Sequence, residues 1–114
     1  MCAIHGYCWQ DKKLIGEMLC KAHHRGPDGQ GTFFNNDISL GHNLLSITDT
    51  PSVSKQPWEH NDLVLVYNGE IYNHMNLRKS LDYKFKTDTD TETLAVGLEK
   101  KGIKFIYELD GMFA

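Results

Sequence analysis

Apolar and polar residues alternate in the first third of the chain in a way that predicts a strand, a helix and a hairpin. Residues 2–8 are small, β-branched or aromatic and are predicted to form a strand. Asp11 can cap a helix after it, because apolar residues recur there every three or four positions and form one buried stripe. Residues 23–31 contain three glycines and a proline and are expected to be a structured loop. A hairpin is predicted over 32–42, with Asn and Asp residues at its turn (35–37).

The middle of the chain combines a polar, proline-containing stretch with an uninterrupted apolar run. Residues 48–62 are expected to be a loop. Residues 63–67 predict a central strand that is covered on both faces. This strand is expected to stop at Asn68-Gly69, a pair that commonly needs a positive φ.

The remaining residues predict two helices and the beginning of a strand. One helix is expected over about 73–81 and another over 90–101, between a capping box at 89–92 and Gly102. Residues 111–114 resemble the first half of a buried strand, yet the chain stops there. We therefore expect a fold that is cut short at its C-terminal side.

Composition and charge exclude several classes of partner. The chain has 114 residues, which is room for one domain, and a formal charge of −3 from 12 basic and 15 acidic residues. It has no basic stripe, so nucleic acid is not expected as a partner. No apolar run reaches the roughly 18 residues of a membrane span, so a membrane is not expected either. Three cysteines without a secretory signal argue against a disulfide framework, and a reduced, cytoplasmic protein is expected.

Cys2 is the first candidate for chemistry because it follows the initiator methionine. Removal of that methionine would give Cys2 both a thiol and a free α-amino group. The pKa of such an amine is about 8 and that of a thiol is about 8.5, so the amine can serve as the local base at neutral pH. Judged by its position alone, Cys2 is more simply explained as an accidental cysteine.

Two Cys-x-x-His pairs indicate a different class of protein, a small zinc-binding module. The pairs are Cys2 with His5 and Cys20 with His23, a spacing that resembles the ligand pairs of a structural zinc site. However, residues i and i+3 of a strand point to opposite faces, and the first pair lies in a predicted strand. Ordinary hydrogen bonding of these histidines is therefore the favoured interpretation, and no metal is expected.

Asn68-Gly69 is the third candidate. A backbone N–H released where a strand ends, next to an Asn side-chain amide, can present two donors to one oxygen, as the oxyanion hole of an acyl-transfer site requires. An ordinary Asn-Gly turn accounts for the same pair. Asp90 likewise has a simple explanation, since an acidic residue in the first turn of a helix stabilises the helix dipole.

The order of the motifs along the chain distinguishes between these alternatives. In sequence they are Met1-Cys2-Ala3-Ile4, His24-Arg25-Gly26-Pro27-Asp28, Leu40-Gly41-His42, Leu45-Ser46-Ile47, Gln56-Pro57, Tyr67-Asn68-Gly69-Glu70-Ile71-Tyr72-Asn73, Asp90-Thr91-Glu92-Thr93 and Gly111-Met112-Phe113-Ala114. Together they resemble the glutamine amidotransferase domain of glutamine-dependent asparagine synthetases, a class II domain of the N-terminal-nucleophile family.

This resemblance covers residues 1–114 and implies an α+β fold, a four-layer α/β/β/α sandwich of which the chain carries only the earlier part. It implies no synthetase domain on this chain. No cofactor is expected here, because ATP and Mg²⁺ would belong to the missing synthetase domain.

The resemblance also implies a role for each matching residue. Cys2 would attack the side-chain amide of glutamine to give a thioester and ammonia, with its own amine carrying the proton. Asn68 and the N–H of Gly69 would hold the oxyanion, while Glu70 and Asp90 would accept hydrogen bonds from the α-ammonium of glutamine. Arg25 would support the nucleophile from the loop that approaches it. The implied substrate-binding residues also include the run Leu44, Leu45, Ser46, Ile47 and Thr48.

Leu44 departs from the family motif Gly-His-x-Arg-Leu-Ser-Ile, in which the arginine grips the α-carboxylate of glutamine. A hydrogen bond to a charged group contributes about 1.5–3 kcal/mol, so we expect glutamine affinity to fall on the order of 10²-fold or more. Arg78 or Lys55 would have to reach the carboxylate to prevent this loss. Ala3 and Ser54 replace family glycines, and Ala3 could crowd the oxyanion site.

Two hypotheses about function follow, with the zinc-binding module as a third. The first is a domain that hydrolyses glutamine and supplies ammonia for asparagine synthesis. The second, motivated by Leu44 and the early stop, is a catalytically degenerate relative that acts as a binding or assembly module. An incomplete sandwich would expose an apolar sheet face, so association with a synthetase polypeptide or with another copy of the chain is expected.

Overall fold

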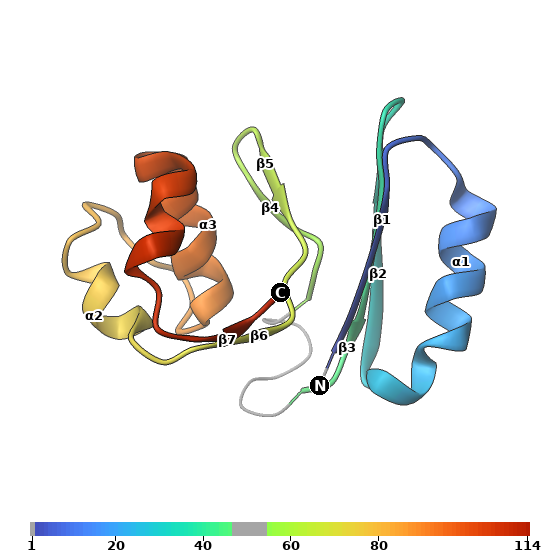
Figure 1. Cartoon of the computed structure of the whole chain (residues 1–114), viewed down its shortest axis with the longest axis horizontal. Coiled ribbons are helices and arrows are strands. Elements are labelled where there is room, and N and C mark those ends of the chain that lie inside the picture. The colour runs from blue at the N-terminus through green and yellow to red at the C-terminus, as the bar shows by residue number, and fades with distance from the viewer. Residues whose placement is uncertain (1, 47–54) are drawn as a thin grey trace.

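The computed structural model describes residues 2–46 and 55–114 of the chain. These residues form an α+β domain with three small antiparallel sheets and three α-helices. Figure 1 shows α1 covering the outer side of a three-stranded sheet, while α2 and α3 lie at the opposite end of the molecule. The two smaller sheets lie between these ends.

The three-stranded sheet confirms the strand and the hairpin predicted for the first third of the chain. It contains β1 (Ala3–Tyr7), β2 (Gly29–Phe34) and β3 (Ser39–Leu44) in the order β1-β3-β2. At the hairpin turn, Asn35 Oδ1 accepts hydrogen bonds from the backbone N–H groups of Asp37 (2.9 Å) and Ile38 (2.8 Å). Such an Asx turn explains why an asparagine begins the reversal.

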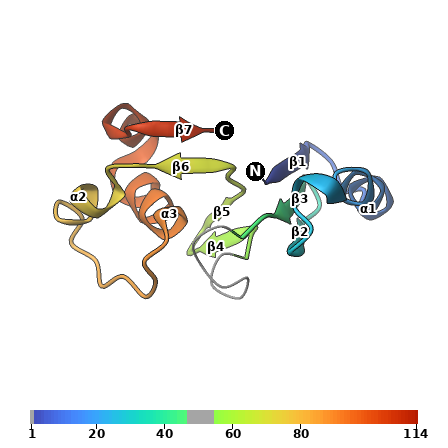
Figure 2. The same ribbon diagram turned by 90° about the horizontal axis from the view of Figure 1, so that it is seen from below.

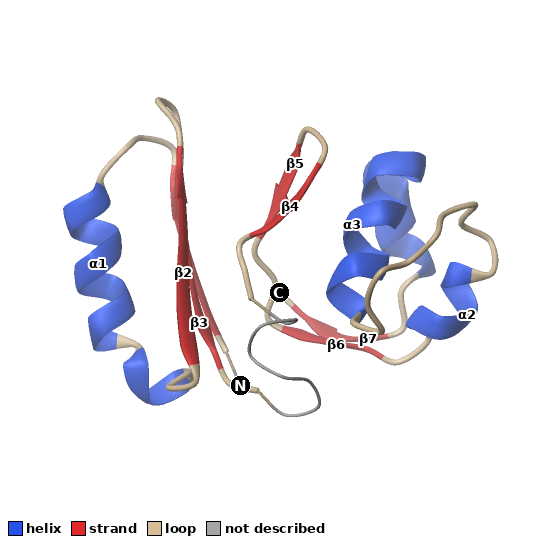
Figure 3. Cartoon of the chain, turned by 180° about the vertical axis from the view of Figure 1, so that it is seen from behind, coloured by secondary structure: helices blue, strands red, loops and turns tan. Residues whose placement is uncertain are grey.

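Helix α1 (Lys12–Lys21) packs on one face of this sheet (Figure 3). Asp11 caps it as predicted, because its side chain accepts a hydrogen bond from Leu14 N–H (2.9 Å). The buried face of α1 meets β3 at Gly41, where an added Cβ would lie 3.2 Å from Ile15 Cγ2. Side chains alternate along a strand, so Leu40 and His42 point to the opposite, inner face of the sheet.

The predicted loop over 23–31 is wrong at its end. A short 3-10 helix, η1 (His23–Arg25), is followed by β2, which already begins at Gly29. The glycines are tolerated in this strand because another segment approaches it closely. A Cβ on Gly31 would lie 1.9 Å from the carbonyl oxygen of Gln56.

The second half of the chain supplies two small sheets and two α-helices. Strands β4 and β5 pair with each other, and so do β6 and β7. The bounds of these elements are β4 Trp58–His60, β5 Leu63–Leu65, β6 Gly69–Ile71, α2 His74–Arg78, α3 Asp90–Lys101, η2 Gly102–Glu108 (a 3-10 helix) and β7 Gly111–Phe113.

Four expectations for this half are wrong in part. Within the predicted loop 48–62, Trp58–His60 forms β4; residues 48–54 lie outside the described part of the chain. Of the central strand predicted over 63–67, only Leu63–Leu65 (β5) forms. Its side chains are partly exposed because β4 is its one strand partner among the described residues. The strand already ends at Leu65, before Asn68-Gly69, while Gly69 has the expected positive φ (159°) and begins β6. The helix predicted over 73–81 is limited to α2.

Helix α3 forms as predicted and carries most of the second core. Thr89 caps it, since its Oγ1 accepts a hydrogen bond from Glu92 N–H (3.3 Å). The reciprocal half of the predicted capping box is wrong, because the Glu92 carboxylate binds backbone N–H groups of the preceding segment instead. The buried apolar residues that pack together here are Tyr67, Ile71, Leu81, Leu94, Val96 and Phe105.

Candidate functional site

Cys2 lies partly exposed at the beginning of β1. Its sulfur is held by the main chain of Leu45, whose N–H donates to Sγ (3.4 Å) and whose carbonyl accepts from the thiol (3.8 Å). By strand alternation Cys2 shares the inner face of the sheet with Ile4. In Figures 1 and 2 the start of β1 faces the start of β6, so the strand that follows Cys2 begins at the junction of the two halves.

The segment that holds the sulfur is braced by Asp28. The Asp28 N–H donates to the Leu44 carbonyl (2.9 Å), and the Asp28 carboxylate accepts from Ser46 N–H (2.8 Å). Arg25 lies exposed on η1 near this end of the sheet, and no hydrogen bond or ion pair joins its side chain to another described residue. The structure therefore gives Asp28, rather than Arg25, a direct connection to the chain around the nucleophile.

The backbone N–H of Gly69 points away from β7. Asn68 and Ala114 exchange both backbone hydrogen bonds (2.9 and 2.8 Å), and in an antiparallel ladder such pairs alternate with pairs that exchange none. Gly69 lies opposite Phe113 and belongs to a pair of the second kind. Two residues further on, Ile71 N–H points to the same edge of β6 and donates to Asp90 Oδ2 (3.0 Å). The Gly69 N–H is thus a donor on the edge that faces Asp90.

Gly69 is required by the close approach of β7. A Cβ there would lie 2.2 Å from the Met112 carbonyl oxygen and 2.5 Å from Phe113 Cα. Alternation along β6 places Ile71, in the core, on the same face as Gly69, and therefore places Asn68 and Glu70 together on the other face. Glu70 is exposed and Asn68 is half-buried.

Asp90, the first residue of α3, is tied to the corner between Val66 and β6. Its Oδ2 accepts from the Tyr67 hydroxyl (2.7 Å) as well as from Ile71 N–H, while Oδ1 receives no hydrogen bond from a described residue. Burial and then the bond to Asp90 raise the pKa of Tyr67 far above its ordinary value, and the charges of Glu70 and Cys2 act in the same direction. The Tyr67 hydroxyl therefore stays protonated, within electrostatic range of Cys2, Glu70 and Asp90.

The position of the missing family arginine is occupied by a buried apolar side chain. Leu44 is only 6% exposed and packs beside Gly29, its partner across the strand pair. Neither cation considered as a substitute is placed there: Lys55 is exposed, and the nitrogens of Arg78 donate to Thr87, Thr89 and Thr93. Two further predicted substrate-binding residues, Ile47 and Thr48, lie outside the described residues.

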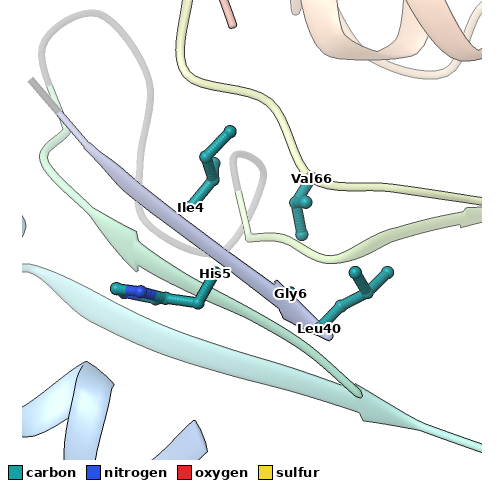
Figure 4. A pocket seen from close by; sticks show the side chains of 5 residues that line it. All are labelled: Ile4, His5, Gly6, Leu40 and Val66. Carbon is teal, nitrogen blue, oxygen red and sulfur yellow. The ribbon is translucent and has the colours of Figure 1, made fainter. Parts of the chain in front are cut away.

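An open pocket of about 340 Å³ lies between the two halves, and it is lined by none of the predicted site residues. In Figure 4 the side chains of Ile4 and Leu40 point toward Val66, while His5 points away from it. The lining is almost entirely apolar. Because a carboxamide needs polar groups to orient it, this pocket does not suit glutamine.

The described residues give no support to a zinc module. Strand β1 places Cys2 and His5 on opposite faces, and His5 Nε2 hydrogen-bonds with Asn43 Oδ1 (2.9 Å). Within 2–46 and 55–114 no group of three or more His, Cys, Asp or Glu side chains is placed to hold a metal ion. In the same ranges no helix has the length and apolar character needed to cross a membrane.

His42 is a buried histidine on the inner face of β3. It is 1% exposed, and its Nε2 makes no hydrogen bond to the part of the chain that the structure describes. Burial lowers the pKa of His42 to about 4, while a backbone hydrogen bond with Tyr67 opposes this shift and the charge of His5 adds to it. The imidazole is therefore neutral in the folded chain at neutral pH.

We expect His42 to destabilise the fold in acid. Between about pH 6.5 and pH 4 the unfolded chain binds a proton on this residue and the folded chain does not, so the free energy of unfolding falls by about 2–3 kcal/mol. Urea titrations at several pH values should show that the free energy of unfolding of His42→Gln falls less between these pH values than that of the parent chain. An equal decline in the variant and the parent chain would contradict the assignment.

Two contacts at the site were not anticipated from the sequence, although both residues belong to its motifs. Tyr67 lies in the motif 67–73 without an expected role of its own, yet its hydroxyl joins Asp90 to the corner that carries Asn68. Leu45 contributes through its main chain, and a main-chain contact leaves no trace in side-chain patterns. The sequence signal for Tyr67 is its place at the end of an apolar run, directly before Asn-Gly.

Comparison with known proteins gives one consistent result. A family model described as a glutamine amidotransferase domain matches residues 1–114. A putative glutamine-hydrolysing asparagine synthetase 2 of Methanocaldococcus jannaschii is 34% identical over all of this chain and 27% of its own length. Glutamine-hydrolysing asparagine synthetases of Arabidopsis thaliana (synthetase 1) and Asparagus officinalis are each 42% identical over 86% of this chain and 17% of their own lengths. The chain thus spans about a quarter or less of these relatives.

Proposed function

Because the chain belongs to the glutamine amidotransferase domain family and aligns with the glutamine-hydrolysing asparagine synthetases, we propose that it hydrolyses glutamine to glutamate and ammonia. The observation that carries this proposal is the arrangement at the junction of the two halves. There β1, which follows Cys2 directly, begins opposite the start of β6 (Figure 2), and the Gly69 N–H lies on the same strand edge as Asp90. A thiol, a backbone N–H without a strand partner among the described residues and a carboxylate near one corner support this proposal.

In this proposal the Cys2 thiolate attacks the amide carbon of glutamine after Met1 has been removed. The negative charge that develops on the amide oxygen is held by the Gly69 N–H and the Asn68 side-chain amide. The α-amino group of Cys2 takes the thiol proton and delivers it to the leaving nitrogen, so that ammonia departs and a thioester remains. Water then attacks the thioester, which releases glutamate and restores the thiol.

The α-ammonium group of glutamine is assigned to the carboxylates of Glu70 in β6 and Asp90 in α3. Asp90 Oδ1 and the exposed Glu70 are the acceptors for the α-ammonium, because Asp90 Oδ2 is already occupied by Tyr67 and Ile71. The main chain of Leu45 and Ser46, which flanks the sulfur, completes the wall around Cys2. Arg25 is assigned a supporting role at the open end of this wall.

We further propose that the described elements are part of a four-layer α/β/β/α sandwich. The succession of α1, the three-stranded sheet, the β6–β7 sheet and α3 supports this arrangement (Figure 1). Both outer edges of the small β6–β7 sheet lack a strand partner among the described residues. Ammonia would be consumed by a synthetase domain such as the one in the asparagine synthetases, either on a longer chain or on a separate polypeptide.

The proposal is tested by ammonia release from glutamine. Chain from which Met1 has been removed should release ammonia, whereas the matched chain that retains Met1 should release none above the buffer, because its α-amine and sulfur are no longer on one residue. Mass spectrometry establishes the N-terminus of each sample. Equal release from the two chains, or none from the processed chain, would overturn the proposed mechanism.

The second candidate function is a degenerate domain that keeps the scaffold without turnover. The burial of Leu44 favours it, because no described cation takes the place of the family arginine. Calorimetric titration with glutamine separates the candidates. Binding in the millimolar range or tighter supports the enzyme, and the absence of binding supports the degenerate domain.

A further inference from the structure

The segment that leads into Asp90 is held by two buried charged side chains. The first is Arg78, at the end of α2, whose side chain is 9% exposed. Its two terminal nitrogens donate to the carbonyls of Thr87 (2.7 Å) and Thr89 (2.6 Å), and its Nε donates to Thr93 Oγ1 (2.7 Å). The guanidinium carbon also lies 4.1 Å from the centre of the Phe85 ring.

The second charged side chain is Glu92, which is 1% exposed. Its carboxylate accepts hydrogen bonds from Lys86 N–H (3.0 Å), from Thr87 N–H (2.7 Å) and from the Thr87 hydroxyl (2.8 Å). Arg78 therefore holds the carbonyls of Thr87 and Thr89, and Glu92 holds the N–H groups of Lys86 and Thr87. Thr87 is bound through both its N–H and its carbonyl.

The charged groups of Arg78 and Glu92 hydrogen-bond to the main chain rather than forming a strong ion pair. Among the described residues, the one acidic partner of Arg78 within ion-pair range is Asp88, at 3.9 Å and 95% exposed, so that contact is weak. Charge-assisted hydrogen bonds to buried peptide groups are stronger and directional. Their effect is to fix the backbone of residues 87–89, directly before Asp90.

We propose that Arg78 is a positioning residue that sets the location of Asp90 for recognition of the α-amino group of glutamine. The inference rests on the proposed function, in which Asp90 binds that group. Arg78 is assigned no contact with the substrate, because each of its nitrogens donates to Thr87, Thr89 or Thr93 in the segment around the start of α3. It acts by holding the N-terminus of α3 where Asp90 Oδ2 meets Tyr67 and Ile71, with Oδ1 left for the ammonium.

The test compares glutamine with 5-amino-5-oxopentanoate, which has the same carboxamide and carboxylate but no α-amino group. In the processed full chain, Arg78→Gln should raise KM for glutamine about 10-fold, as expected when a charge-assisted contact is lost. It should leave kcat for glutamine and KM for the analogue within about twofold. The matched control is Lys79→Gln, at the next residue along the chain, because the one hydrogen bond of the exposed Lys79 side chain to a described residue is to Asn76 Oδ1 (3.0 Å), so this variant should behave as the parent chain.

Arg78→Lys keeps the charge but not the fork of donors, so it should give an intermediate KM for glutamine; it also replaces Arg78→Gln if that variant does not fold. All assays are run well below the lowest melting temperature of the set. An equal rise in KM for both substrates, or no rise for glutamine, would overturn the positioning role while leaving glutamine hydrolysis intact. Absence of hydrolysis of both substrates by the parent chain would overturn the proposed function, and this inference with it.

Discussion

Cys2→Ser is expected to lower glutamine hydrolysis by at least about 10³-fold in the processed chain. A serine hydroxyl has the shape of the thiol but is a much poorer nucleophile at neutral pH. The α-amine can deprotonate a thiol to a thiolate, but it cannot deprotonate a hydroxyl to a comparable extent. The backbone at this position is held by the pairing of Ala3 with Asn43, so the substitution should not disturb the sheet. The measurement is single-turnover ammonia release at saturating glutamine.

The chain itself supplies matched controls for this substitution. Cys8 and Cys20 are both exposed and lie away from the junction, so Cys8→Ser and Cys20→Ser should each retain the parent rate within about twofold. If Cys2→Ser kept the parent rate, or if a control lost activity to the same degree, the assignment of the nucleophile would be wrong.

Leu44→Arg is expected to raise kcat/KM for glutamine about 10²-fold. An arginine can grip a carboxylate through two parallel hydrogen bonds, and about 2.7 kcal/mol from such a grip corresponds to this factor. Leu44 ends β3 directly before Leu45, the residue whose main chain holds the Cys2 sulfur. By alternation its side chain belongs to the inner face of the sheet, as does that of Cys2.

Leu44→Arg should lower the stability of the chain when no substrate is bound. Leu44 is buried, so an unpaired guanidinium there is expected to lower the melting temperature by several degrees, and glutamine should restore part of the loss. Leu44→Met is the control for packing alone and should bring no gain. The α-amide of glutamine, which lacks the carboxylate charge, should show no preference for the arginine variant; an equal gain with this amide would contradict the assigned role.

Local features of the fold were predictable because their causes lie within a few residues. Asp11 and Thr89 each cap the helix that follows them, and Asn35 turns the hairpin through its own side chain. The strand β1 follows from its alternating pattern. The contacts made by the two helix caps and by Asn35 span no more than four positions along the chain.

Other features were not predictable because their partners are distant in sequence. Gly31 is required in β2 because the Gln56 carbonyl approaches that strand closely. The direction of the Gly69 N–H depends on pairing with residues more than 40 positions further on. The candidate site residues could be named from motif resemblance, but the connection of Asp90 to Tyr67 required the folded chain.

The central claim, that Cys2 is a nucleophile facing a glutamine site, is tested most directly by covalent labelling. The processed chain is incubated with 6-diazo-5-oxo-L-norleucine, a glutamine-like electrophile, and the modified peptides are identified by mass spectrometry. Our account predicts one adduct per chain, on Cys2, that excess glutamine prevents, with Cys8 and Cys20 unmodified. An unlabelled Cys2 in chain that has lost Met1, or equal labelling of all three cysteines, would contradict it.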